Sequence, residues 1–194
     1  MLLVLFVSVC AQAQTHTLAV YAGSASGLHP ESKSAMKAEV QRLLSPATLE
    51  VIWKNTAEKR AGEDFEFVAV ASFEGSCAVS QAVPAVATVS LADTSVSDGR
   101  ILPFFTIDCT RVIQMLGPHV EPTVLGRALG RIIAHELYHI VARTSDHHDT
   151  GVAKAAFSIR DLTNSRFEFD AWSLSRMNPA PMARPSESPE AAGR

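Results

Sequence analysis

The longest helical pattern in the chain covers residues 122 to about 143. Its apolar side chains recur at the three- and four-residue spacing of an amphipathic helix, and its first residue, Pro122, is well tolerated at a helix start. The second half of the pattern carries His135, Glu136 and His139. Residues four apart project from one face of a helix, so the two imidazoles can bind one metal ion. The pattern therefore predicts a long helix with a metal-binding face.

Two glycines on the same predicted helix indicate how the helix packs. Gly126 and Gly130 lie one turn apart and, at about 100° per residue, face away from His135 and His139. Glycine lowers the stability of a helix, so its presence here needs a cause. We expect both glycines to permit a close approach to a neighbouring sheet or helix.

The rest of the chain alternates between strand-like and helix-like segments. Strands are predicted at residues 17–21, 49–53, 65–73, 85–91 and 101–107, and further helices at 31–44 and 158–176. Pro103 indicates that the last strand is an edge strand or bulged, and we take residues 101–109 as the edge of the sheet. These segments predict one α/β domain over residues 14–177. It would hold a mixed, twisted sheet of four or five strands, two or three helices and a small loop-rich C-terminal part.

The two ends of the chain are not expected to belong to this domain. No charged residue precedes Glu31, residues 2–9 are apolar, and Ala11-Gln12-Ala13 forms an A-x-A-like cleavage site. This pattern predicts a signal peptide, residues 1–13, with a buried N-terminal strand as the alternative. The apolar run is shorter than the roughly 20 residues of a membrane span. We therefore expect an exported protein, periplasmic or secreted, without a membrane span. Residues 178–194 are predicted to be a disordered tail.

Composition adds limits on partners and on covalent links. The net charge is −3 and no basic block occurs, so nothing points to nucleic acid as a partner. Removal of residues 1–13 leaves Cys77 and Cys109. Two cysteines in an exported domain suit one disulfide, and two buried free thiols are the alternative.

The motif His135-Glu136-x-x-His139 has a chemistry of its own. A bound Zn²⁺ lowers the pKa of its water ligand to about 7, and Glu136, directed away from the ligand axis, can take the proton. The same carboxyl group can then pass the proton to a leaving amine. A zinc site needs a third protein ligand. His147 is the first choice, and His148 is an alternative to it.

The stretch from His135 and His139 through His147 to Gly151-Val152 resembles the zincin superfamily of metalloproteases. Its nearest branch is the metzincins, with the motif His-Glu-x-x-His-x-x-Gly-x-x-His and a methionine-containing turn. The resemblance implies that the three histidines bind zinc, that Glu136 is the general base, and that substrate lies along an edge strand of the sheet.

The chain departs from the metzincin pattern at several positions. Ala142 occupies the glycine position and Ser145 the usual third-histidine position, so His147 comes two residues later. Met177 is the candidate for the methionine turn. A second zincin branch, the gluzincins, takes its third ligand from a glutamate on a later helix, where Glu168 is available. The resemblance is thus to a divergent, minimal branch.

These residues predict zinc-dependent hydrolysis of peptide bonds in a peptide or protein substrate, by a metal-activated water with Glu136 as general base. One alternative is a metal-dependent amidohydrolase that acts on a non-peptide amide. Another is a non-catalytic binding protein on a zincin scaffold. Glu136 argues against the last, because a pure metal binder has no need of a carboxylate there.

Overall fold

The computed structural model describes residues 15–58, 63–79 and 90–178. Within them, five strands form one mixed sheet in the order β2-β1-β3-β5-β4. The strands are β1 (His16–Ala22), β2 (Leu49–Asn55), β3 (Phe67–Glu74), β4 (Ala92–Ser97) and β5 (Arg100–Asp108). Neighbouring strands run parallel except for β4, which is antiparallel to β5. The predicted mixed sheet of an α/β fold is confirmed.

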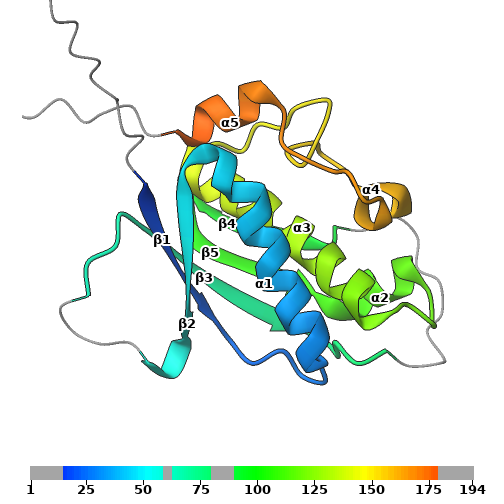
Figure 1. Ribbon diagram of the computed structural model, residues 1–194. Helices are drawn as coiled ribbons and strands as arrows, with labels where there is room; N and C mark the ends of the chain where they lie inside the picture. The colour runs from blue at the N-terminus through cyan, green and yellow to red at the C-terminus, as the bar shows by residue number, and fades with distance from the viewer. Residues whose placement is uncertain (1–14, 59–62, 80–89, 179–194) are drawn as a thin grey trace, which may run out of the picture.

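Two long helices pack on one face of this sheet. α1 (Pro30–Leu44) connects β1 to β2, and α3 (Pro122–Ala142) lies beside it (Figure 1). The shorter helices are α2 (Cys109–Leu116), α4 (Ile159–Thr163) and α5 (Ala171–Met177), and the 3-10 helices η1 (Ser45–Ala47) and η2 (Thr56–Glu58) flank β2. The apolar core fills the space between the sheet and the long helices.

The two glycines of α3 lie against α1, as the close approach expected from the sequence requires. A Cβ at Gly126 would lie 2.2 Å from the carbonyl oxygen of Ser32, and one at Gly130 would lie 2.8 Å from that of Met36. Because position 126 faces 32 and position 130 faces 36, the two helices run in the same direction. Both run from the carboxyl ends of the parallel strands toward their amino ends.

A buried ion pair connects these helices to the C-terminal part. Arg131 of α3 is fully buried, and its Nε donates to Oε1 of Glu39 on α1 at 2.8 Å. Its two terminal nitrogens donate to the carbonyl oxygens of Asp161 at 2.6 Å and Asn164 at 2.7 Å. A buried charge is tolerated when it is paired and hydrogen-bonded, and this one orders the segment around α4.

The predicted position of the sheet edge is wrong. β5, expected over residues 101–109 as an edge strand, pairs with both β3 and β4, so β4 is the edge on this side. Residues 80–89 lie outside the described residues, and they include most of the strand predicted at 85–91. Pro103 precedes Phe104, where the pairing with β3 begins, and the ladder with β4 shifts register between Thr94 and Val96. The proline is therefore accommodated at an irregularity, which was the other reading of it.

The C-terminal helix predicted at residues 158–176 is also wrong. It is two short helices, each started by its own side-chain cap: Ser158 caps α4 and Asp170 caps α5. The helix α2, begun by an Asp108 cap, was not predicted. Short polar residues cap helices because their side chains accept hydrogen bonds from otherwise unpaired N–H groups. Three such caps divide the chain more finely than its apolar periodicity indicates.

The chain is covalently linked between Cys77, after β3, and Cys109, the first residue of α2. Of the two alternatives for these cysteines, the structure has the disulfide and not the pair of free thiols. The predicted signal peptide, residues 1–13, and all of the predicted tail except its first residue, Asn178, lie outside the described residues. In the part of the chain that is described, no helix is long and apolar enough to cross a membrane.

Candidate metal centre

His135 and His139 lie on the last two turns of α3 and are both buried. Nδ1 of His135 lies 2.8 Å from the carbonyl oxygen of Val152, and Nδ1 of His139 lies 2.7 Å from that of Thr144. A carbonyl oxygen can only accept a hydrogen bond, so each Nδ1 carries the proton and donates it. Burial lowers the pKa of His135 to about 3 and lowers that of His139. Both rings are therefore neutral, with a lone pair on Nε2.

The two lone pairs converge. Nε2 of His139 lies 3.1 Å from Nε2 of His135. With both hydrogens on Nδ1, neither Nε2 can donate to the other, so a cation between them is what this geometry suits. Nitrogen ligands at the usual distance from tetrahedral zinc are roughly 3.3 Å apart, close to the separation seen here.

His147 completes a group of three. Candidate ligand atoms of His135, His139 and His147 all lie within 4.8 Å of one another. The ring of His147 lies 4.8 Å from that of His139 and 5.2 Å from that of His135, centroid to centroid. His147 is the exposed member, whereas His135 and His139 are buried. The three predicted histidines thus form a possible metal-binding arrangement.

The loop that follows His147 packs against the segment around Glu168. Gly151 has a positive φ of 69°, and a Cβ there would lie 2.5 Å from the carbonyl oxygen of Glu168. The neighbouring Val152 donates its N–H to the same oxygen at 3.1 Å, and its own carbonyl accepts from His135. Only glycine fits this conformation and approach without strain. The loop therefore fixes the acceptor that orients His135.

Glu136 points toward the edge strand. Its side chain is buried, and Oε2 accepts a hydrogen bond of 2.5 Å from Oγ1 of Thr94 on β4. Burial raises the pKa of the Glu136 carboxyl to about 7, the hydrogen bond from Thr94 opposes this shift, and Asp93 adds to it. In the metal-free chain, the Glu136 carboxyl group therefore changes its protonation state near neutral pH. Thr94 was missed because β4 was not predicted.

The alternative third ligands lie elsewhere. Nδ1 of His148 is 2.9 Å from Oδ2 of Asp170, and its ring stacks on Trp172 at 5.1 Å. Glu168 is exposed and lies 3.7 Å from Arg42. Neither belongs to the group of three histidines.

Met177, the candidate for the methionine-containing turn, lies in a helix instead of a turn. Met177 is the buried last residue of the helix α5. The metzincin pattern therefore does not extend to this element.

No protein-family model matches the chain, and no curated protein is significantly similar to it. The site is therefore defined by its geometry alone. That geometry supports metal binding by three histidines, and it leaves the metal and the reaction to be proposed.

Proposed function

We propose that the chain is a zinc-dependent peptidase of zincin type. The donor set fits this metal, because catalytic zinc sites have three protein ligands and one open position, and imidazole is a common ligand. His135, His139 and His147 would hold the ion through ring nitrogens. When bound, Zn²⁺ supplies a Lewis acid for the scissile carbonyl and makes water acidic enough to attack it at neutral pH.

Glu136 is the group that moves protons in this proposal. The hydroxyl group of Thr94 already donates a hydrogen bond to Oε2 of Glu136. We therefore assign Oε1 to accept the proton of the attacking water. The carboxylic acid then donates that proton to the departing amine nitrogen. The hydrogen bond between Thr94 and Glu136 is the observation on which the proposal depends. A chain that only stores metal has no need of a buried carboxyl group next to its metal ligands.

The edge strand supports a peptide substrate. Among the strands of the described residues, β4 pairs with β5 on one side and forms the end of the sheet on the other. An extended peptide can add to such an edge through main-chain hydrogen bonds, with its side chains in alternating directions. Because Thr94 on β4 contacts Glu136, a peptide bound along this strand passes the proposed base. A small non-peptide amide would make no use of the strand.

The test is a peptide-library digest with the zinc-loaded chain. Glu136→Gln is the control, because it keeps the shape of the side chain and removes its basicity. We expect cleavage by the unsubstituted chain, and zinc binding without cleavage by the variant. Cleavage of small aryl amides but of no peptide would favour the amidohydrolase alternative. Equal cleavage by the variant would overturn the role of Glu136.

A further inference from the structure

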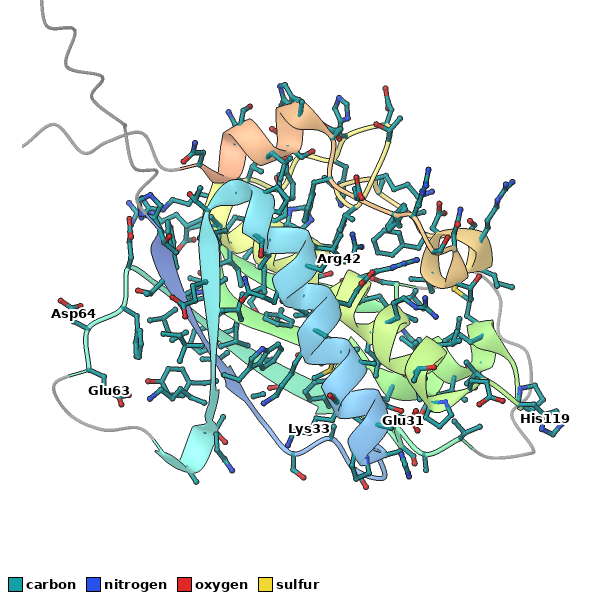
Figure 2. All side chains as sticks on the ribbon, in the orientation of Figure 1. Glu31, Lys33, Arg42, Glu63, Asp64 and His119 are labelled. Atoms are coloured by element: carbon teal, nitrogen blue, oxygen red, sulfur yellow. A yellow bond between two sulfur atoms is a disulfide. The ribbon has the colours of Figure 1, made fainter. Side chains whose placement is uncertain are left out.

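A pocket lies away from the histidines. Its volume is about 520 Å³, and its walls include Ser24, Lys33, Lys37, Trp53, Lys54 and Phe73. Lys33 lies at the start of α1, whereas Arg42, near the other end of α1, contacts the C-terminal part (Figure 2). The histidines lie near the end of α3, which runs in the same direction as α1. The pocket and the metal centre are therefore at opposite ends of the helix layer.

The position of the pocket in the sheet is one where ligands bind in α/β proteins. β1 is flanked by β2 and β3, both parallel to it. The chain passes from β1 to β2 on one side and then crosses to β3 on the other. At such a reversal of strand order, a crevice opens at the carboxyl ends of the strands. The lining residues Ala22, Trp53 and Phe73 belong to these ends.

The charge of the lining is one-sided. Lys33, Lys37 and Lys54 line the pocket, and none of the described lining residues is acidic. Lys54 is paired with Glu63 at 2.8 Å. Lys33 and Lys37 are four residues apart on α1, a spacing at which like charges repel. Burial, and then the charge of Lys33, lower the pKa of Lys37.

Aromatic and apolar side chains lie beside these lysines in the lining. The ammonium group of Lys37 lies 5.4 Å from the centre of the Trp53 ring, and Met36, Leu28 and Phe73 line the pocket as well. Pockets for small molecules combine such apolar walls with a few charged groups that fix orientation.

We infer that this pocket binds a small organic anion with a carboxylate or phosphate head group and an apolar or aromatic body. The head group pairs with Lys33 and Lys37, and the body lies against Trp53 and Phe73. The hydroxyl groups of Ser24 and Thr56, also in the lining, provide further hydrogen bonds. This site is independent of the proposed peptidase and needs no metal.

The fluorescence of Trp53 provides the assay. The chain has two tryptophans, so Trp172→Phe leaves Trp53 as the only reporter. Phenyl phosphate, benzoate and the uncharged benzyl alcohol are titrated in the presence of a chelator. We expect saturable changes with one or both anions in the millimolar range or below, and none with the alcohol. The phosphate and carboxylate probes distinguish the head groups.

Lys33→Gln and Lys37→Gln test the contacts. Each should weaken anion binding about tenfold, equivalent to about 1.4 kcal/mol. Arg100→Gln is the matched control, because it removes one positive charge at the start of β5, far from the pocket. Calorimetry on the unsubstituted chain checks the result without any variant. Equal binding of the alcohol, no saturation, or full affinity in Lys37→Gln would overturn the inference and leave the metal centre unaffected.

Discussion

Thr94 donates a hydrogen bond of 2.5 Å to Oε2 of Glu136, and so joins the edge strand β4 to the long helix α3. The two residues are 42 positions apart in the chain. The hydroxyl group at this point holds Oε2 of the Glu136 carboxyl group toward β4. This hydrogen bond therefore connects the strand proposed to hold a peptide with the helix proposed to cut it.

Replacement of Thr94 by valine should slow turnover without loss of metal. The variant keeps the branched shape but leaves Oε2 of Glu136 without its donor. We expect kcat to fall about tenfold, less than the roughly 100-fold or more that a general acid–base group contributes, with zinc content unchanged. Thr94→Ser should restore most of the rate, because it retains the hydroxyl group. A Ser variant as slow as the Val variant would point to packing instead of orientation of the carboxyl group.

Replacement of Gly151 by alanine should weaken the metal site through the loop. The new Cβ would lie 2.5 Å from the carbonyl oxygen of Glu168 and would displace Val152, which holds His135. Lost orientation of a liganding histidine typically costs about 10- to 100-fold in metal affinity. Competition with a chromogenic chelator measures this loss.

Gly99 offers a matched control for that variant. Its φ of 72° is similar, but a Cβ there would meet nothing within 4 Å. Gly99→Ala therefore carries the backbone strain without the collision. We expect it to retain full zinc affinity. If both variants lose the same affinity, the contact with Glu168 is not what holds the loop.

Glu39→Gln should lower stability at neutral pH and flatten its dependence on acid. Burial alone would raise the pKa of Glu39, but hydrogen bonds from Arg42 and Arg131 outweigh it and hold this pKa below its ordinary value. A lowered pKa in the folded state means that Glu39 stabilises the fold above its unfolded pKa, about 4.5. That contribution is lost as the pH falls through the folded value.

Urea unfolding of the metal-free chain at several pH values measures this effect. Removal of one partner from a buried ion pair costs about 3 kcal/mol, so Glu39→Gln should be less stable by that order near pH 7. The difference from the unsubstituted chain should shrink below about pH 4.5. The exposed Glu50, replaced in the same way, should change little. A constant difference at every pH would contradict the assigned ion pair.

Loss of the disulfide should destabilise the chain. Cys77 and Cys109 are separated by 32 residues, a loop for which chain entropy gives about 3–4 kcal/mol. The double serine variant and the reduced chain should lose similar stability in the same unfolding assay. The proposal of export also predicts no free thiol in a chain without residues 1–13, which a thiol titration checks. Two reactive thiols there would contradict both the bridge and an oxidising compartment.

The helix α3 and the shared face of its two histidines could be predicted because they depend on periodicity and spacing. His135, Glu136 and His139 lie on a helix that extends only one residue less than expected, and Gly126 and Gly130 make the close contact that they suggested. Local spacing on a helix determines which side chains share a face, so no tertiary information was needed.

The edge strand and the supporting contacts could not be predicted, for a physical reason. Pro103 fits either an edge or an irregular strand, and only the pairing partners distinguish the two. The acceptors on Val152 and Thr144 are backbone carbonyls, which every residue has, so nothing in the sequence marks them. Thr94 was hidden for the same reason, since its role depends on which strand lies beside α3.

Zinc content of the purified chain, measured by elemental analysis, tests the central claim most directly. His147→Ala and His148→Ala form the decisive pair, because the two residues are adjacent but only His147 belongs to the group of three. We expect about one zinc per chain in the unsubstituted protein and in His148→Ala, and little in His139→Ala or His147→Ala. No zinc in the unsubstituted chain after reconstitution, or full zinc in His139→Ala, would contradict the account.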